Sequence, residues 1–378
     1  MILTDDQRMI CDMARAFARE ELAPHAEAWE AAGEIPAEIF AKMGQLGFMG
    51  MTVPERWGGA GADYVSYALA LMEIAGGNGA LSTIMSVNNA PVCAALLKDG
   101  NDAQKERFLR PLAQGKMIGA FCLTEPQAGS DAAALKARAK RSNDGYVLTG
   151  AKQFITSGKI AGAAIIFAVT DPEAGKRGIS AFVAPTDTPG YVVSKIEHKM
   201  GQKASDTCAI TFEDMKLPAD CLLGAEGDGY KIALANLEAG RIGIAAQSVG
   251  MAQAALDYAI AYAKERQSFG KPIIEHQAVG FRLADMAARL EAARQLVLHA
   301  AALKDAGAPC LTQACMAKLV ASETAEAVCS TAIQTLGGYG YLQDYPIERI
   351  YRDVRVCQIY EGTSDIQRLI ISRDLMAA

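Results

Sequence analysis

The chain has 378 residues, of which 51% are hydrophobic and 21% charged, and its formal net charge is −6. This composition is typical of a soluble globular protein with two or three domains, and an acidic chain without a long basic run is not expected to bind nucleic acid. The longest apolar stretch, residues 161–169, is too short for a membrane span, so no membrane association is expected. The N-terminus lacks a secretion signal, which predicts a cytoplasmic protein, or a mitochondrial matrix protein if a transit peptide was removed.

The first third of the chain carries the patterns of α-helices. Thr4 followed by Gln7 is a capping box, and apolar residues at helical spacing continue until Pro24, which we expect to end the helix. We therefore predict a helical N-terminal domain over residues 1–117. Further helical patterns, with a loop at 54–59 between them, cover residues 37–45, 63–75, 80–98 and 102–112.

The next hundred residues consist of short β-rich runs separated by turns. Asn143-Asp144-Gly145 is a favourable hairpin turn. We predict a middle domain over residues 118–225, built as a small antiparallel sheet or barrel. The clearest strand patterns are residues 145–149, 164–169, 179–183 and 208–212.

Helical patterns return after residue 225. A broad apolar stripe predicts one long, largely buried helix over residues 229–267. We expect two more long helices at 276–304 and 311–335, and a last helix that begins at Thr363 or Ser364. The prediction is an α+β multidomain protein whose C-terminal domain, residues 226–378, resembles a four-helix bundle.

A single carboxylate near the C-terminus stands out. Glu361 lies between the apolar pair Ile359-Tyr360 and a Gly362-Thr363-Ser364 turn that precedes the last helix. Apolar neighbours solvate a carboxylate poorly and raise its pKa, which suits a general base near neutral pH. From this segment alone, a capping loop with an exposed glutamate remains the alternative interpretation.

Several common catalytic signatures are absent. The sequence has no dinucleotide-binding glycine fingerprint, P-loop, His-Glu-x-x-His or Gly-x-Ser-x-Gly motif, and its four histidines do not predict a metal site. Its nine cysteines form no Cys-x-x-Cys pair and read as reduced core residues.

Two polar segments remain as binding candidates. Residues 120–131 are rich in hydroxyls and turn residues that offer backbone N–H groups to a polar ring or a phosphate. Residues 152–158 end a strand on which Phe154 and Thr156 share a face. A purely structural turn is the alternative for each segment.

Six motifs in order, on this α–β–α layout, resemble the acyl-CoA dehydrogenase family of flavoproteins. The resemblance covers nearly the whole chain and is strongest to the short-chain and short/branched-chain (butyryl-CoA-type) members, through the segment 240–247. The motifs are Leu123-Thr124-Glu125-Pro126 with Gly129-Ser130-Asp131, Phe154-Ile155-Thr156, Arg266-Gln267-Ser268-Phe269-Gly270, His276-Gln277, Gln334-Thr335-Leu336-Gly337-Gly338-Tyr339-Gly340 and Tyr360-Glu361-Gly362-Thr363-Ser364.

The resemblance implies FAD as cofactor, bound between the β domain and the C-terminal helices. Thr156 is expected near flavin N5, and Phe154, where many relatives carry Trp, is expected to stack on the ring. The residues implied for the flavin and its attached chain are Phe121, Leu123, Thr124, Gly129, Ser130, Phe154, Ile155, Thr156, Thr363 and Asp365.

A second group is implied to contact FAD across subunits, which implies a homotetramer built as a dimer of dimers. Arg266 and Gln277 resemble the pair that reaches the FAD diphosphate, and a guanidinium fork suits phosphate oxygens. A solvated charge is the alternative for Arg266. The group comprises Arg266, Phe269, Gln277, Gln334, Gly337 and Gly338.

The resemblance also implies the reaction. Glu361 would remove the α-proton of a short- or branched-chain acyl-CoA while a hydride passes from the β-carbon to flavin N5, giving trans-2-enoyl-CoA. Electrons would then pass to an electron-transferring flavoprotein, in fatty-acid β-oxidation or branched-chain amino-acid degradation. The residues implied to contact or position the substrate are Ser130, Tyr230, Glu238, Arg241 and Gly362.

Relatives of other branches offer alternatives. Isovaleryl- and long-chain-type members carry the base just before the residue equivalent to Arg241, where this chain has Gly240, and Glu238 should point to another side of the helix. Glutaryl-type members carry an arginine at the position that appears here as Ser82. An oxidase that uses O₂ and a non-catalytic DNA-associated relative remain alternatives, and the acyl chain length is not determined by the sequence.

Overall fold

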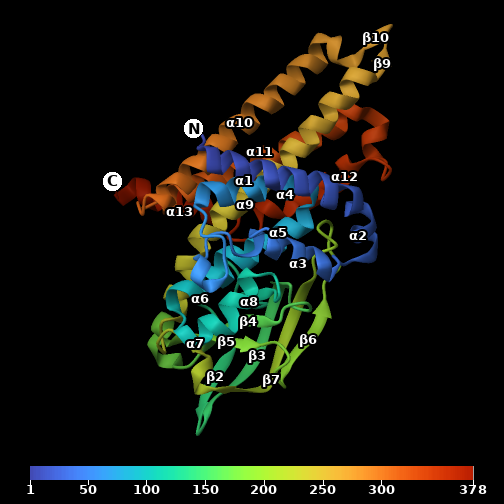
Figure 1. The fold of residues 1–378 in the computed structure, drawn as a ribbon. Helices are drawn as coiled ribbons and strands as arrows, with labels where there is room; N and C mark the ends of the chain where they lie inside the picture. Colours follow the sequence, from blue (N-terminus) through green and yellow to red (C-terminus); the bar gives the residue numbers. More distant parts are fainter. Residues whose placement is uncertain (378) are drawn as a thin grey trace.

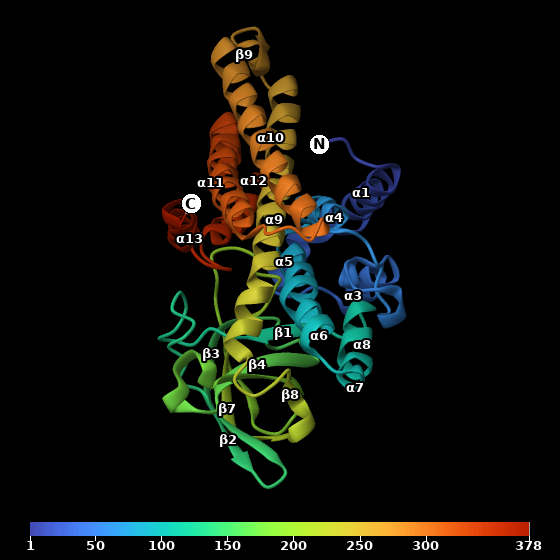
Figure 2. The same ribbon diagram turned by 90° about the vertical axis from the view of Figure 1, so that its left-hand side faces the viewer.

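The structure, a computed structural model, describes residues 1–377. Helices of the N-terminal third lie beside the long C-terminal helices, and the sheet forms the opposite end of the molecule (Figure 1). A view from the side shows α9 running from the sheet to the far tip (Figure 2). This α–β–α order confirms the predicted fold class.

The N-terminal helices begin at the predicted capping box, in which the Gln7 N–H donates to Thr4 Oγ1 over 3.2 Å. The expectation that Pro24 ends the helix is wrong. The α-helical hydrogen bonding ends at Phe17, a π-helical turn follows, and Pro24 sits at the start of the next turn, where its missing N–H is not needed. The elements are α1 (Asp5–Phe17), η1 (Ala18–Leu22), η2 (Ala23–His25), α2 (Ala26–Ala32), α3 (Ala37–Gln45), η3 (Phe48–Gly50), η4 (Glu55–Trp57), α4 (Tyr64–Gly77), α5 (Gly79–Val87), η5 (Asn88–Cys93), α6 (Ala94–Asp99), α7 (Asp102–Gln104), η6 (Lys105–Leu109) and α8 (Arg110–Ala113).

The predicted helix at 80–98 is continuous but contains a π-helical turn around Pro91, which has no N–H to donate. The stretch Gly79–Asp99 is long and apolar enough to cross a membrane, yet 83% of its most apolar window is buried inside the fold. Burial of this kind is expected of a core helix.

The β domain contains one eight-stranded sheet with the path β6-β7-β3-β2-β4-β5-β8, in which β1 also pairs with β4. The expected antiparallel sheet is wrong in part, because β4 pairs in parallel with both β1 and β2. The sequence pattern of a strand indicates its burial but not its direction, so the parallel pairing of β1 with β4 was not predicted. The hairpin at Asn143-Asp144 is confirmed by the pairing of Ser142 with Gly145. The elements are β1 (Gly119–Cys122), β2 (Arg138–Ser142), β3 (Gly145–Thr156), β4 (Ala163–Val169), η7 (Pro172–Gly178), β5 (Ile179–Pro185), β6 (Tyr191–Ile196), β7 (Thr207–Pro218), η8 (Ala219–Cys221) and β8 (Leu222–Leu223).

The C-terminal part contains the three predicted long helices and a last helix that begins at Ser364. The helices α2 and α12 and the small β9–β10 hairpin were not predicted. The helix α2 and the hairpin are too short to show a clear period, whereas α12 is as long as the predicted α3. The elements are α9 (Gly229–Glu265), β9 (Gln267–Ser268), β10 (Lys271–Pro272), η9 (Ile273–Glu275), α10 (Gln277–Asp305), α11 (Leu311–Leu336), η10 (Gly337–Tyr341), α12 (Pro346–Val354), η11 (Arg355–Gln358) and α13 (Ser364–Ala377).

The hydrophobic cores join these parts. One core is shared by the N-terminal helices and the C-terminal helices, so α4 and α9 pack as neighbours rather than in separate units. A second core lies between the sheet and the helices α6 and α8, and a third lies on the other face of the sheet. The N-terminal end of α9 therefore contacts the sheet, while most of its length is buried among helices.

Candidate active site

The turn between η11 and α13 holds Glu361 in an unusual backbone conformation. Glu361 has φ +55° and Gly362 has φ +86°. A left-handed φ is strained for glutamate, and such strain persists where surrounding contacts enforce it. Here the Gly362 carbonyl accepts hydrogen bonds from Lys318 Nζ at 2.8 Å and from Gln367 Nε2 at 2.7 Å. We call residues 360–362 the base turn.

The Glu361 carboxylate faces α9 at Gly240. A Cβ atom built on Gly240 would lie only 2.4 Å from Glu361 Oε2, so the missing side chain provides the space for the carboxylate. Oε2 is buried and has no hydrogen-bond partner. Burial raises the pKa of Glu361 to about 7, although the charges of Arg241 and Lys318 lower it.

The direction of this pKa shift agrees with the sequence analysis, but its cause is different. Ile359, expected to shield the carboxylate, is 53% exposed. The shielding comes instead from α9, which contributes Gly240 to the contact. The carboxylate is thus desolvated by a helix more than a hundred residues earlier in the chain.

Two buried cations lie near the carboxylate. Arg241 is 5% exposed and its Nε atom has no partner, so its guanidinium remains available to a bound group. Lys318 on α11 is fully buried, and burial lowers its pKa to about 8. Arg241 was expected at the site from the sequence, whereas Lys318 was not, because one lysine in a long helical pattern gives no signal of its own.

The other residues implied for the substrate lie near the start of α9 and on the sheet. Glu238 is turned away from Glu361, since its carboxylate pairs with Lys304 Nζ at 2.7 Å. The Tyr230 ring is half-buried beneath Lys176 Nζ, 5.2 Å from the ring centroid. Ser130 is exposed in the turn that follows β1.

The two polar segments of the β domain lie side by side. The Gln153 N–H donates to the Thr124 carbonyl at 2.8 Å, which fixes the turn after β1 against β3. A buried ion pair supports this contact, because Lys152 Nζ reaches both Glu125 Oε1 at 2.8 Å and the Leu123 carbonyl at 3.1 Å. We call residues 123–130 with 153–156, which are expected from the sequence to lie at the flavin, the flavin wall.

The side chains of the flavin wall do not all face outward. Phe154 is 64% exposed at a left-handed φ of +59°, beside a bulge that breaks the simple alternation assumed for Phe154 and Thr156. Leu123 and Ile155 are buried in the core, and Phe121 packs on Phe167. Leu123 and Ile155 can therefore contact a ligand at this surface only through their backbone atoms, whereas Phe154 can do so through its ring.

The second group of residues implied for FAD lies at the far tip. An open groove of about 540 Å³ is lined by residues that include Arg266, Gln334, Gly337 and Gly338. Arg266 covers the Tyr339 ring in this groove, with its guanidinium carbon 5.5 Å from the ring centroid. The β9–β10 hairpin, with its Phe269 96% exposed, marks the same end (Figures 1 and 2). Within one chain this group lies at the tip of the long helices, away from the flavin wall in the β domain (Figure 2).

The described residues fit a large, elongated cofactor. The Ser364 hydroxyl, next to the base turn, is buried without a partner and can bond a bound group. A Cβ atom added at Gly129, Gly337 or Gly338 would meet nothing within 4 Å, so a ligand can approach the backbone closely at both places. These features suit the hydroxyl and phosphate groups of FAD.

The chain is similar to known proteins over nearly its whole length. The models of the acyl-CoA dehydrogenase N-terminal, middle and C-terminal domains match residues 4–116, 120–215 and 227–376. The human mitochondrial short-chain specific acyl-CoA dehydrogenase is 46% identical over 99% of this chain and 91% of its own length.

Two solved structures are also similar along their whole length. Butyryl-CoA dehydrogenase from Megasphaera elsdenii has a TM-score of 0.96 and 42% identity, covering 100% of this chain and 99% of its own. A structure from work on the electron transferring flavoprotein of Acidaminococcus fermentans has a TM-score of 0.98 and 45% identity, with full coverage of both chains. The chain belongs to the acyl-CoA dehydrogenase family, whose members are FAD-dependent oxidoreductases that act on CH–CH bonds.

Proposed function

We propose that the protein oxidises the Cα–Cβ bond of a short- or branched-chain acyl-CoA to the trans-2-enoyl thioester, with Glu361 as the α-proton base. The observation that carries this proposal is the state of the Glu361 carboxylate, which is buried, unpartnered at Oε2 and shifted to a pKa of about 7. A carboxylate with this pKa is partly ionised at neutral pH and more so above it, and it is more basic than an ordinary carboxylate. It is therefore better suited to remove a proton from a weak carbon acid.

The base turn also supplies a group for the thioester oxygen. The Glu361 N–H lies outside the helices and donates to no acceptor among residues 1–377. A free N–H aimed at the developing enolate oxygen contributes about 3–4 kcal/mol to a reaction of this kind. The left-handed backbone at Glu361 and Gly362 explains how one turn presents both the carboxylate and the N–H.

Bound FAD supplies the acceptor for the hydride that leaves the β-carbon. In this proposal Thr124, Ser130, Phe154 and Thr156 hold the flavin on the exposed face of the flavin wall. Arg266, Gln277 and the groove at 334–338 contact the FAD of a neighbouring subunit, because the groove lies toward the β9–β10 end of the long helices and away from the β domain (Figure 2). This contact requires at least a dimer, and the proposed homotetramer, a dimer of dimers, contains it.

The arrangement along α9 favours a short acyl chain. If the CoA moiety lies at Ser130 and Tyr230, the acyl end extends past Gly240 toward the following turns of α9. There a Cβ on Gly243 would lie 2.6 Å from Ser86 Oγ and 2.8 Å from Tyr67 OH, so these side chains already fill the space. The relatives named for butyryl-CoA and short-chain substrates support the same substrate class.

The proposal is tested by the colour and bleaching of the flavin. Purified protein should be yellow and should bleach under anaerobic conditions when butyryl-CoA or isobutyryl-CoA is added. Glu361→Gln should retain FAD and bind acyl-CoA yet lose turnover by orders of magnitude, whereas Glu238→Gln should lose far less. Turnover that survives Glu361→Gln would place the base elsewhere, and protein that cannot be reconstituted with FAD would reject the proposal.

We further propose an electron-transferring flavoprotein as the electron acceptor. The similar structure from work on such a flavoprotein supports this partner. Turnover should depend on added electron-transferring flavoprotein and yield little hydrogen peroxide. Peroxide formed at the rate of turnover would instead identify an oxidase.

A further inference from the structure

The base turn and the flavin wall come from different parts of the chain, and one loop of the β domain touches both. This loop, residues 197–206, joins β6 to β7 and we call it the β6–β7 loop. At its end, the Asp206 carbonyl accepts the Ser157 N–H at 3.1 Å and Asp206 Oδ1 accepts the Lys159 N–H at 2.9 Å. These bonds fix the loop directly after Thr156 of the flavin wall.

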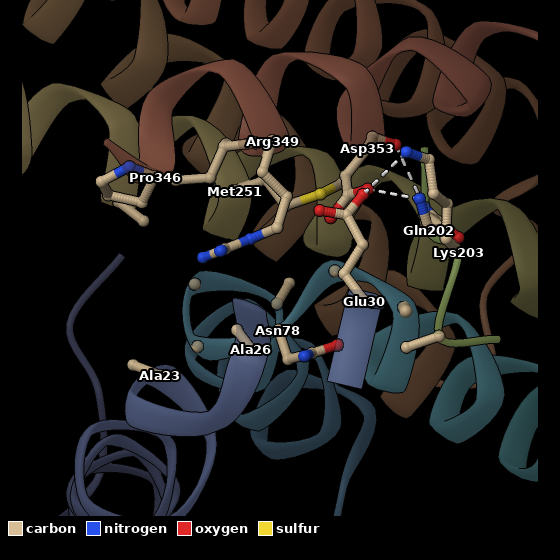
Figure 3. Close-up of a pocket in the computed structure, with 18 of the residues that line it drawn as sticks. Ala23, Ala26, Glu30, Asn78, Gln202, Lys203, Met251, Pro346, Arg349 and Asp353 are labelled. Carbon is tan, nitrogen blue, oxygen red and sulfur yellow. Dashed lines mark hydrogen bonds and ion pairs between the residues drawn. The ribbon is translucent and has the colours of Figure 1, made fainter. Parts of the chain in front are cut away.

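The middle of the β6–β7 loop lies directly on α12. A Cβ atom at Gly201 would lie 2.3 Å from the Arg352 carbonyl, so the two backbones are in contact. The next residue, Gln202, is 4% exposed and has a left-handed φ of +50°. Its backbone N–H donates to Asp353 Oδ1 and its Nε2 donates to the Asp353 carbonyl at 3.1 Å (Figure 3).

The Gln202 side chain also reaches the base turn. Its Oε1 accepts the Thr83 hydroxyl at 2.6 Å, and its Nε2 lies 3.4 Å from Tyr360 OH. Tyr360 OH donates to Gln247 Oε1 at 2.7 Å, and Gln247 Nε2 donates to Thr83 Oγ1 at 2.5 Å. These four side chains form a closed, buried ring of hydrogen bonds, and Tyr360 is the residue before Glu361.

We propose that Gln202 is a positioning residue that sets the Glu361 carboxylate relative to the flavin wall. The proposal rests on Glu361 being the base, as proposed above. A proton leaves the α-carbon and a hydride leaves the β-carbon, so the base and the flavin must both be held against the substrate at the same time. A shift of about 1 Å in either one costs about 100-fold in rate. The β6–β7 loop connects the two acceptor sites by a chain of contacts that runs from Ser157, next to Thr156, through Asp206 and Gln202 to Tyr360.

The physical reason for choosing Gln202 over its partners is its position in the network. Thr83, Gln247 and Tyr360 belong to the helical parts and the base turn, while Gln202 alone of the ring comes from the β domain. Its strained φ shows that the surrounding bonds hold it against its local preference. Without its amide, the ring stays on the helical side and the β domain loses its link to Tyr360.

The test uses the FAD-loaded protein and Gln202→Met, which keeps the length of the side chain but removes its hydrogen bonds. We expect anaerobic flavin reduction by butyryl-CoA to slow by about 10- to 100-fold, with FAD content and KM little changed and a modest fall in Tm that leaves the protein folded at the assay temperature. A 3-thia-acyl-CoA, which can lose its α-proton but cannot be oxidised, should give a weaker charge-transfer absorption. Lys203→Ala is the matched control, because Lys203 is the next loop residue and its half-exposed side chain pairs with Glu30 only at 3.6 Å.

A second variant covers the case in which Gln202→Met does not fold. Thr83→Val removes the hydroxyl at the other side of the ring and leaves the Gln202 bonds to Asp353 intact, and it should slow flavin reduction in the same direction. Normal reduction rates in the folded variants, or losses that follow FAD release or unfolding, overturn the inference. Activity retained in Glu361→Gln would reject the base assignment instead, so the two failures are distinguishable.

Discussion

Alanine at Gly240 is expected to slow the enzyme without unfolding it. The added Cβ atom would lie 2.4 Å from Oε2, 2.9 Å from Cδ and 3.2 Å from Oε1 of Glu361, where ordinary contact begins at 3.4 Å. The atoms it meets are the end of a flexible side chain, not backbone. The carboxylate should therefore move by about 1 Å while the helix stays in place.

The two effects of this substitution have opposite signs. A 1 Å misplacement of the base corresponds to about a 100-fold slower reaction, or about 2.7 kcal/mol in the activation barrier. Replacing glycine by alanine inside a helix stabilises it by about 1 kcal/mol, and Gly240 lies within α9 without a left-handed φ. We therefore expect a slower enzyme whose Tm is unchanged or slightly raised.

Stopped-flow measurement of flavin bleaching by butyryl-CoA, together with thermal unfolding, checks this expectation. Gly76→Ala is the matched control, since its added Cβ would meet only ordinary contacts, the nearest being the Gly250 carbonyl at 3.4 Å. It should gain helix propensity with no loss of rate. Wild-type rates in Gly240→Ala would refute the placement of the carboxylate against α9, and a large loss of Tm would show that the backbone moved instead.

The remaining predictions concern charge. Flavin reduction at low substrate concentration should rise with pH through about 7, because Glu361 accepts a proton only when ionised. Its pKa is raised above 4.5 on folding, so its contribution to stability falls as pH rises from about 4.5 to 7, and Glu361→Gln should raise Tm more at pH 8 than at pH 5. Lys318→Met removes a charge that lowers this pKa, so the midpoint of the pH–rate profile should move upward, and an unchanged midpoint would contradict this. Glu125→Gln strands the buried Lys152 charge and should cost about 3–5 kcal/mol with loss of FAD, which a second change, Lys152→Met, should partly restore; unchanged Tm in the single variant would contradict this.

The sequence predicted the elements that have a clear period and strong end signals. The helices α9, α10 and α11 appear where their apolar stripes indicated, and the Thr4 capping box begins α1. Strand direction was not predictable in the same way, because a buried run such as β1 reads alike in parallel and antiparallel pairs. The π-helical turns were equally invisible, since they differ from an α-helix only in hydrogen-bond pairing.

The candidate site shows the same division between local and long-range signals. The motifs located the base turn and the flavin wall because each is a short, unusual run of residues. Lys318 and Gln202 carry no local signal, since a lysine in a helix and a glutamine in a loop are ordinary, and only packing brings them to Gly362 and Tyr360. Residues that position a site by long-range contact are therefore the ones that sequence reasoning misses.

Gly240 has a physical role because it lacks a side chain. The sequence analysis used this glycine only to reject a rival base on the long helix. In the structure, the same missing side chain leaves the space that the Glu361 carboxylate occupies. A base on α9 at position 240 and a base at position 361 would claim the same volume, so a chain of this fold has room for one of them. The glycine thus supports the assignment of Glu361 by geometry as well as by elimination.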